Sequence, residues 1–346
     1  MRRSGSDPDF SVLVTGGLGY IGSHACVVLA AAGYRLVVVD NLSNSKPAVL
    51  ERLRGLTGAA IEFHRADLRE RTALDQAFAG QRIDAVIHFA GLKAVGESVE
   101  KPQLYYDNNV GGTQALLDAV THHGVRRLVF SSSATVYGEP ERLPLREDHR
   151  LAPQNPYGET KLVIERLLAD RSGADPGFDH ASLRYFNPIG AHPSGRIGDD
   201  PRGIPNNLLP YVAQVAVGRQ PKLRVFGNDY PTPDGTGVRD YIHVMDLAAG
   251  HVAALEYLRK KRRSLTVNLG TGRGYSVLEV VRAFERASGK TIPLEFAPRR
   301  PGDVAACYAD PAAAAAELGW RAHLDLDAMC RDAWRWQSAN PEGYPN

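Results

Sequence analysis

The chain has 346 residues, of which 43% are hydrophobic and 23% charged; this composition gives no sign of disorder and allows a large core. A formal net charge of +2 gives no strong field toward nucleic acid or an anionic membrane, so neither partner is expected. Cys26, Cys307 and Cys330 show neither disulfide nor metal-ligand spacing. No apolar run reaches the length of a membrane span, and the first residues lack the apolar core of a signal peptide. We expect a cytoplasmic protein without a metal ion, in which residues 1–8 form a disordered tail.

The first half alternates short apolar runs with helical stretches. The runs are apolar on both faces, as buried parallel strands are, and they cover residues 12–14, 36–39, 85–89 and 127–130. Residues 21–32 and 112–123 between them carry helical spacing. This rhythm predicts an α/β protein with a Rossmann-like, doubly wound parallel sheet over residues 9–188.

After Asn187 the rhythm gives way to loop-rich sequence, which predicts a smaller mixed α/β substrate domain over residues 189–346. Residues 239–244 read as a strand that leads into a helix, and we expect residues 236–262 to return to the first domain. The basic run at 259–263 is interpreted as a complement to the carboxyl end of that helix. Asp310 and Pro311 predict the start of a helix over residues 312–316.

A glycine turn follows the first predicted strand. Gly16, Gly19 and Gly22 stand where the chain passes from that strand into a helix, a context that favours a pyrophosphate at the helix amino terminus. Asp40 ends the second strand, 18 residues beyond Gly22, where its carboxylate can accept hydrogen bonds from ribose hydroxyls. A 2′-phosphate would be repelled there. The turn therefore predicts NAD rather than NADP.

Two other strand ends fit the same ligand. Asp67 and Leu68 follow a strand and could lie against the adenine. Residues 89–93 end another strand with small residues and one cation, Lys93. Taken singly, either stretch could be ordinary strand-end chemistry.

Tyr157 and Lys161 are spaced to share one helix face if Asn155 and Pro156 open that helix. A lysine ammonium there would favour the phenolate, and lowering a tyrosine pKa to about 6 or 7 requires about 4 to 5 kcal/mol. With 14 tyrosines in the chain, the pair alone could arise by chance. Ser133, at the end of a predicted strand, would project into the same crevice and hydrogen-bond a substrate oxygen.

Together, Ser133, Tyr157 and Lys161 on this scaffold resemble the extended short-chain dehydrogenase/reductase family. Within that family the chain resembles the UDP-galactose 4-epimerases, and the resemblance extends from about Ser11 to Pro345. The longer motifs that carry it are residues 91–98, 131–138, 203–208 and 237–244. The resemblance implies reversible C4 epimerisation of UDP-galactose and UDP-glucose through a 4-keto intermediate, with a tightly held NAD. It implies that Tyr157 takes the 4-hydroxyl proton, that Lys161 lowers the tyrosine pKa and holds the nicotinamide ribose, and that Ser133 bonds the reacting oxygen.

The resemblance also implies the ligand contacts. The implied cofactor-binding residues are Gly16, Gly19, Tyr20, Ile21, Gly22, Asp40, Asn41, Asn44, Ser45, Asp67, Leu68, Phe89, Ala90, Gly91, Lys93, Asn108, Ser131, Tyr157, Lys161 and Tyr185. The implied substrate-binding residues are Lys93, Ser133, Tyr157, Phe186, Asn187, Asn207, Leu208, Arg224, Phe226, Arg239, Arg300, Asp303 and Cys307. Arg239 and Arg300 would pair with the diphosphate, and Asp303 would hold the uridine ribose.

Cys307 bears on specificity. Some members of the family carry a bulky tyrosine against the hexose where this chain has Cys307, four residues after Asp303. The smaller side chain leaves room for a 2-acetamido group. We hypothesise that UDP-GlcNAc and UDP-GalNAc are also substrates.

Three other functions compete with epimerisation. A 4,6-dehydratase commonly carries Thr-Asp-Glu at the strand end that reads Ser133-Ala134-Thr135 here, so dehydration is disfavoured. A UDP-glucuronate epimerase or decarboxylase is excluded less firmly. A dinucleotide-sensing regulator could dispense with Tyr157 and Lys161, yet both are present. Members of the family commonly form homodimers, and the helix from about Gly112 and the helix that carries Tyr157 are the candidate faces.

Overall fold

The structure is a computed structural model that describes residues 10–300 and 302–345, so the expected tail of residues 1–8 lies outside the described residues. The chain folds into two compact units. The first unit contains the chain up to Gly138, Leu151–Arg184 and Ala248–Val267. The second unit contains Glu139–Arg150, Tyr185–Leu247 and the chain from Asn268 onward.

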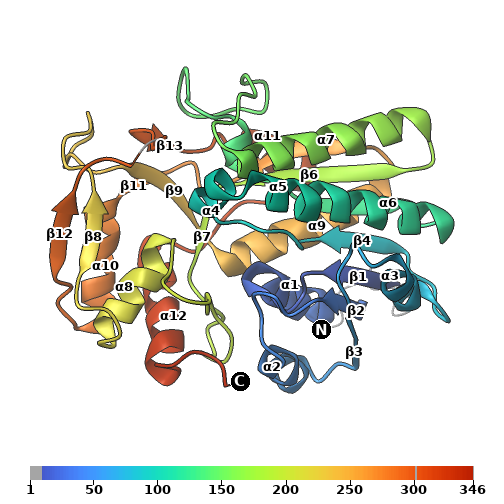
Figure 1. Cartoon of the computed structure of the whole chain (residues 1–346), viewed down its shortest axis with the longest axis horizontal. Helices are drawn as coiled ribbons and strands as arrows, with labels where there is room; N and C mark the ends of the chain where they lie inside the picture. The colour runs from blue at the N-terminus through green and yellow to red at the C-terminus, as the bar shows by residue number, and fades with distance from the viewer. Residues whose placement is uncertain (1–9, 301, 346) are drawn as a thin grey trace. The chain divides into compact units, whose positions relative to one another are not determined.

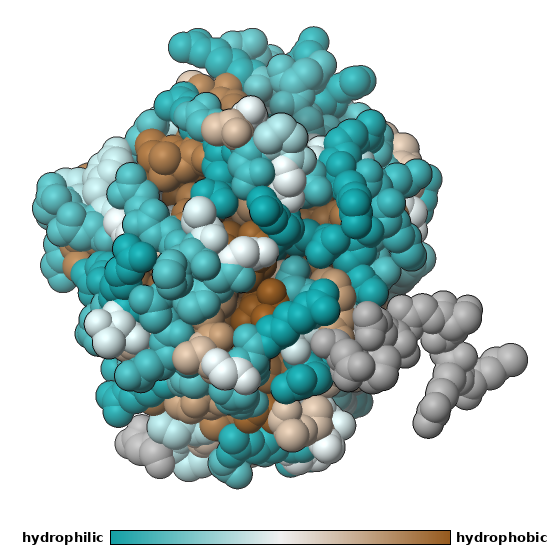
Figure 2. Space-filling model, turned by 90° about the vertical axis from the view of Figure 1, so that its right-hand side faces the viewer, coloured by the Kyte–Doolittle hydropathy of each residue, from teal (hydrophilic) through white to brown (hydrophobic). Residues whose placement is uncertain are grey.

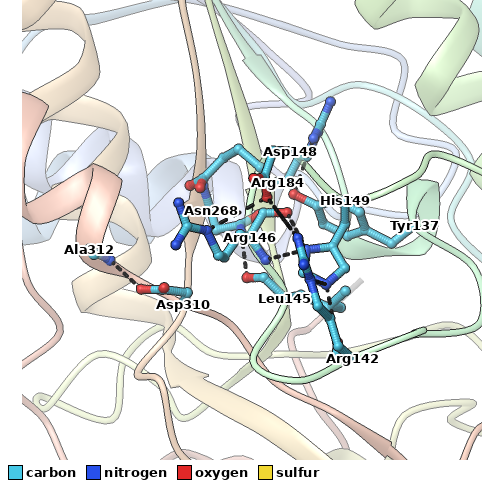
Figure 3. A network of polar contacts seen from close by, with 11 residues as sticks. Tyr137, Arg142, Leu145, Arg146, Asp148, His149, Arg184, Asn268, Asp310 and Ala312 are labelled. Atoms are coloured by element: carbon cyan, nitrogen blue, oxygen red, sulfur yellow. Dashed lines mark hydrogen bonds and ion pairs between the residues drawn. The ribbon is translucent and has the colours of Figure 1, made fainter.

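This division differs from the predicted domains. The main part of the first unit ends at Arg184 rather than at residue 188, and the returning segment covers residues 248–267 rather than 236–262. The segment 139–150, predicted to lie in the first domain, belongs to the second unit. Its Leu145 N–H donates to the Tyr308 carbonyl at 2.9 Å. The Leu145 carbonyl accepts the Asp310 N–H at 2.7 Å and Asn268 Nδ2 at 2.9 Å (Figure 3).

The first unit is built on a seven-stranded sheet. Its strands are β1 (Ser11–Thr15), β2 (Arg35–Asp40), β3 (Ile61–Arg65), β4 (Ala85–His88), β5 (Arg127–Ser131), β6 (Asp179–Tyr185) and β10 (Leu265–Leu269). They lie in the order β10-β6-β5-β4-β1-β2-β3, and each neighbouring pair from β6 to β3 is parallel. Both β1 and β4 are buried along their whole length, as strands covered on both faces are. The predicted Rossmann-like parallel sheet is confirmed.

Helices cover both faces of this sheet (Figure 1). They are α1 (Tyr20–Ala31), α2 (Ala48–Thr57), α3 (Arg71–Phe78), α4 (Val95–Glu100), α5 (Pro102–Tyr105), α6 (Gly112–His122), α7 (Pro156–Ala174) and α9 (Val244–Lys261), with a π-helix η1 (Tyr106–Gly111) and a 3₁₀ turn η2 (Ala134–Val136). Leu74 of α3, Leu116 of α6 and Leu168 of α7 share one apolar core with the sheet. Helices α1 and α9 lie on the opposite face (Figure 1). The sheet is thus doubly wound, and its carboxyl edge carries the candidate site.

The second unit has its own core. Its strands are β7 (Asn187–Ile189), β8 (Leu223–Phe226), β9 (Val238–His243), β11 (Gly274–Ser276), β12 (Leu294–Ala297) and β13 (Ala306–Cys307). Its helices are α8 (Leu208–Ala216), α10 (Val277–Ser288), α11 (Ala312–Leu318) and α12 (Leu326–Ala339). Strand β9 pairs with β7, β11 and β13, and β8 pairs with β12. The predicted helix after Asp310 is present; Pro311 occupies its cap position, and the Asp310 carboxylate accepts the Ala312 N–H at 2.9 Å (Figure 3).

The face of the molecule shown in Figure 2 is mainly hydrophilic, with scattered hydrophobic groups. Within residues 10–300 and 302–345, every helix is either too short or too polar to cross a membrane. In that same part of the chain, no group of His, Cys, Asp and Glu side chains is placed to hold a metal ion.

Candidate active site

The glycine turn between β1 and α1 is too tight for side chains. A Cβ on Gly22 would lie 2.2 Å from the Gly16 carbonyl oxygen, and one on Gly16 would lie 2.7 Å from the Ala90 nitrogen. Gly16 also has a φ of +65°, which other residues rarely adopt. Helix α1 begins at Tyr20 without an acidic residue in its first turn, so its positive end is not neutralised by its own sequence. This shape and charge fit the pyrophosphate of a dinucleotide.

Asp40 ends β2 as predicted and is buried. Its Oδ2 accepts the Leu18 N–H at 3.0 Å, while Oδ1 accepts the Leu42 N–H at 2.9 Å and the Ser45 hydroxyl at 2.8 Å. A carboxylate accepts about four hydrogen bonds, so one direction on Oδ2 is left for a ribose hydroxyl. Asp40 therefore ties the glycine turn to β2, and its role as an acceptor for NAD stays a prediction. The spacing predicted the second role and not the first.

Asn41 and Asp67 meet beyond the ends of β2 and β3. Asn41 Nδ2 donates to Asp67 Oδ2 at 3.0 Å, and Arg69 Nε donates to Asp67 Oδ1 at 2.8 Å. The hydrogen bond from Arg69 holds the pKa of Asp67 well below its usual range, although partial burial opposes this. Leu68 beside it is buried, and Asn44 is exposed. The structure brings Asn41 and Asp67 together at the predicted adenine side.

The loop after β4 is held by a residue that the sequence did not single out. Asn109, buried in η1, accepts the Leu92 N–H at 2.8 Å and donates to the Leu92 carbonyl at 3.0 Å. Its neighbour Asn108, the predicted cofactor residue, donates to the Asn109 side chain at 3.0 Å. The exposed Lys93 lies 6.0 Å from the centroid of the Tyr20 ring. The sequence pattern does not show which of the two asparagines is buried and bonds Leu92, because their side chains are placed differently only by the π-helix.

Helix α7 starts as predicted and carries the expected pair. Asn155 caps it, accepting the Gly158 N–H at 2.9 Å, and Pro156 takes the first helical position. Tyr157 and Lys161 are 7% and 4% exposed. Lys161 Nζ lies 5.9 Å from the centroid of the Tyr157 ring and donates to the Ser131 carbonyl at 2.8 Å. The cation thus lies beside the phenol and is anchored to the end of β5.

Ser133 follows β5 at the turn that contacts the first turn of α7. Its hydroxyl accepts the Thr135 N–H at 3.2 Å and lies 2.9 Å from Thr135 Oγ1. A Cβ on Gly158 would lie 2.9 Å from the Thr135 carbonyl oxygen, so this glycine permits the close approach of the two turns. The segments that carry Ser133 and Tyr157 are therefore brought together, as the sequence predicts.

Lys161 keeps its charge although it is buried. Burial lowers the pKa of Lys161 to about 8, and the negative charge of Glu165 opposes this effect. At neutral pH most of the ammonium remains protonated. The arrangement can therefore stabilise a phenolate at Tyr157, which is what a tyrosine general base requires.

The second unit gathers several predicted substrate residues around one carboxylate. Arg300 Nε donates to Asp303 at 2.9 Å, and Arg239 Nη2 lies 3.9 Å from the same side chain. The guanidinium groups of Arg300 and Arg224 lie 4.7 and 5.4 Å from the centroid of the Phe226 ring. Two arginines around one carboxylate leave a net positive charge, which suits a diphosphate.

Cys307 lies on β13, paired in register with Arg239 of β9. Burial raises the pKa of the Cys307 thiol to about 11, so this side chain is a small neutral group. Phe186 is buried, Asn187 is exposed at the start of β7, and Asn207 is exposed just before α8. Leu208 packs against the core of the unit, and Tyr185 is half-buried. The proximity of Phe186, Asn187, Asn207 and Leu208 to Asp303 stays a prediction.

Comparison with known proteins identifies the family. The model of a family described as GDP-mannose 4,6 dehydratase matches residues 13–333. A UDP-glucose 4-epimerase of Bacillus subtilis (strain 168) is 61% identical over 334 residues, which cover 96% of this chain and 98% of that protein. The chain belongs to the UDP-glucose 4-epimerase family. The mouse UDP-glucose 4-epimerase is 58% identical over 96% of this chain and 98% of its own length.

Solved epimerase structures share the fold. The UDP-glucose-4-epimerase of Stenotrophomonas maltophila, with bound NAD and formylated UDP-arabinopyranose, has a TM-score of 0.94 and 54% identity over 96% of this chain and 99% of that chain. The UDP-glucose 4-epimerase of Bifidobacterium longum in complex with NAD+ and UDP also has a TM-score of 0.94, with 52% identity over 96% and 100%.

The family model and the epimerase relatives name different reactions. Water elimination by a 4,6-dehydratase needs an added acid/base pair, whereas this strand end reads Ser133-Ala134-Thr135 and offers no carboxylate. In the structure Thr135 bonds Ser133 instead. This local chemistry agrees with membership of the epimerase family.

Proposed function

We propose that the chain catalyses the reversible C4 epimerisation of UDP-galactose and UDP-glucose with tightly bound NAD. The observation that carries this proposal is the buried Lys161 ammonium beside Tyr157, on a helix whose first turn meets the turn of Ser133. Gly16, Gly22 and Asp40 form the cradle and the acceptor that would hold the dinucleotide. When bound, NAD accepts the C4 hydride of the sugar and returns it.

The side chains supply the proton chemistry. The Tyr157 phenolate takes the proton of the 4-hydroxyl and later returns it, while the charge of Lys161 favours the phenolate. The Ser133 hydroxyl bonds the reacting oxygen. The 4-keto sugar loses the stereochemistry at C4, and turning the hexose about the diphosphate linkage presents its other face. There is no net oxidation.

Inversion requires a loose hold on the hexose and a firm hold on the nucleotide. We assign the firm hold to Arg239 and Arg300 at the diphosphate and to Asp303 at the uridine ribose. Phe226, with Asn207 and Leu208, would frame the uracil. The hydrogen bond of 2.9 Å from Arg300 Nε to Asp303 supports this assignment, because it places the two side chains next to each other.

The test of this function uses the protein as purified, with no NAD added. We expect it to interconvert UDP-galactose and UDP-glucose, followed by NMR of the anomeric protons. A 4-keto-6-deoxy product would support the dehydratase instead. Turnover of UDP-glucuronate alone would support the second competing function, and NAD binding without turnover of any UDP-sugar would support the regulator.

Cys307→Tyr tests the specificity hypothesis. We expect the wild type to epimerise UDP-GlcNAc and UDP-GalNAc, because a partly buried cysteine leaves space that a tyrosine would fill. In Cys307→Tyr, kcat/KM for the acetylated substrates should fall about tenfold or more relative to UDP-galactose, which is the selectivity that steric pocket contacts usually provide. Equal ratios of the two activities in both proteins would contradict the hypothesis.

We also propose a homodimer that forms through the first unit. Val95, Val99, Leu104 and Tyr106 are exposed hydrophobic residues on α4, α5 and η1, which directly precede the predicted dimer helix α6. In sedimentation experiments we expect a dimer, and Val99→Asp should weaken it about tenfold or more because a buried charge would be left unpaired. Leu294→Asp, which adds the same charge at an exposed apolar site of the second unit, is the control. A monomeric wild type would contradict the proposal.

For location we propose the cytoplasm. The support is that Cys26, Cys307 and Cys330 are all free thiols, which is usual in a reducing compartment. Cell fractionation with antibody detection would test this assignment.

A further inference from the structure

Glu165 is a buried carboxylate one helical turn beyond Lys161 on α7. Ser132 Oγ donates to it at 2.5 Å, and Arg184 of β6 donates from Nε at 3.0 Å and from Nη2 at 2.7 Å. Arg184 is buried as well, and its Nη1 donates to the Tyr137 hydroxyl at 3.1 Å (Figure 3). Burial by itself would lower the pKa of Arg184, but the hydrogen bonds and charge of Glu165 outweigh it and raise this pKa.

A buried ion pair of this kind is poorly explained by stability alone. Removing two charges from water costs several kcal/mol per ion, and apolar residues of similar volume often serve a core equally well. The sequence does carry a signal for Glu165, since Tyr157, Lys161 and Glu165 are spaced four residues apart and share one helix face. Arg184 comes from a distant strand and has no such signal.

The position of Glu165 points to the catalytic side chains. Lys161 donates to the carbonyl of Ser131, and Glu165 accepts from the hydroxyl of Ser132. Ser131 is the last residue of β5, and Ser132 follows it and immediately precedes Ser133. Lys161 and Glu165, one turn apart on α7, therefore bond two consecutive residues before Ser133. These bonds fix the position of Ser133 relative to Tyr157.

Glu165 also supplies the negative charge that acts on Lys161. Three histidines also lie near Lys161, Glu165 or the end of β5: His88 on β4, His180 on β6 and His251 on α9. His251 Nε2 lies 3.4 Å from Ser131 Oγ. Burial lowers the pKa of His88 to about 3 and that of His180 to about 4, so both are neutral at physiological pH. Glu165 therefore provides the negative charge that acts on Lys161, and Arg184 is the ion-pair partner of Glu165.

We propose that Glu165 and Arg184 are positioning residues for the proposed epimerisation, which hold Lys161 and Ser133 in place and balance the buried charge beside Tyr157. This inference rests on the proposed function, because it uses Tyr157 as the base. Neither residue touches the reacting atoms in this assignment; each acts through Lys161 and the end of β5.

The test compares Glu165→Gln with the double variant Glu165→Gln/Arg184→Met. The single variant removes a negative charge and leaves a buried cation, so Lys161 and Tyr157 should both lose their protons more readily. We expect both limbs of the pH profile of kcat to move to lower pH by about one unit, the size of effect that one nearby charge produces. The double variant removes both charges, and its profile should return toward that of the wild type.

The control is Asp170→Asn, the same loss of charge at an exposed position of α7, which should leave both limbs in place. If Glu165 and Arg184 had a purely structural role, kcat would fall in both variants, and the pH profile of the double variant would not return toward that of the wild type. That result, or unshifted limbs in Glu165→Gln, would overturn the proposal.

A second measurement needs no turnover. The tyrosinate of Tyr157 can be titrated by ultraviolet difference absorbance, with Tyr157→Phe as the reference in each background, in protein that carries its NAD and is saturated with UDP. The midpoint should fall in Glu165→Gln and recover in the double variant. If the wild type binds NAD and UDP but does not epimerise, the proposed function fails, whereas this titration still decides the role of Glu165.

Discussion

Replacing Tyr157 by phenylalanine should lower kcat for UDP-galactose by about 10² to 10⁴-fold, the usual contribution of a positioned acid/base group. The change removes only the hydroxyl, so the buried ring and its place beside Lys161 remain. Bound NAD and the affinity for UDP should therefore be close to those of the wild type. The rate is measured by NMR of the sugar nucleotides, and UDP affinity by calorimetry.

Tyr106→Phe is the matched control, because Tyr106 is 37% exposed on η1 and has no assigned part in the reaction. Its turnover should equal that of the wild type. Unchanged turnover in Tyr157→Phe would falsify the assignment of this phenol as the base. A loss of NAD together with turnover would instead indicate a structural effect on the cofactor site.

Gly22→Ala should produce a less stable protein that is purified without NAD. The new Cβ would lie 2.2 Å from the Gly16 carbonyl oxygen and 2.8 Å from the Gly17 α-carbon, and both are backbone atoms that cannot move aside alone. Overpacking of this kind costs about 1 to 3 kcal/mol or more. The cofactor content is measured on denatured protein, and the loss of stability by the shift in thermal midpoint.

Gly173→Ala provides the comparison, since among the described residues nothing beyond the adjacent residues and the nearby backbone of α7 itself lies within 4 Å of a Cβ built at this position. A helical glycine replaced by alanine should gain about 0.5 to 1 kcal/mol of stability and keep its NAD. A Gly22→Ala protein that retains NAD as well as Gly173→Ala does would show that the tight turn is not what holds the dinucleotide.

Features with a local cause were predictable from the sequence. The buried strands of the first unit follow from continuous apolar runs, and Asn155 with Pro156 locates the start of α7 because cap and proline preferences act within a few residues. Those two signals place Tyr157 and Lys161 correctly. The parallel sheet and the end of β2 at Asp40 followed from the same alternation of strands and helices.

Features that depend on distant contacts were not predictable. The segment 139–150 carries no pattern of its own that assigns it to the second unit, because its bonds reach Asn268, Tyr308 and Asp310. Asn109 differs from Asn108 only through the π-helix around it. The same holds for Arg184, whose partner Glu165 lies on another element.

The crossings between the two units limit how this protein can diversify. The chain passes from one unit to the other after Gly138, Arg150, Arg184, Leu247 and Val267, so no single cut releases either unit as an unbroken piece. A recombination event with one breakpoint would therefore give a hybrid that mixes fragments of both units. Exchange of the whole second unit would need a breakpoint at each of the five crossings, so single substitutions are the simpler route by which this chain could change its substrate preference.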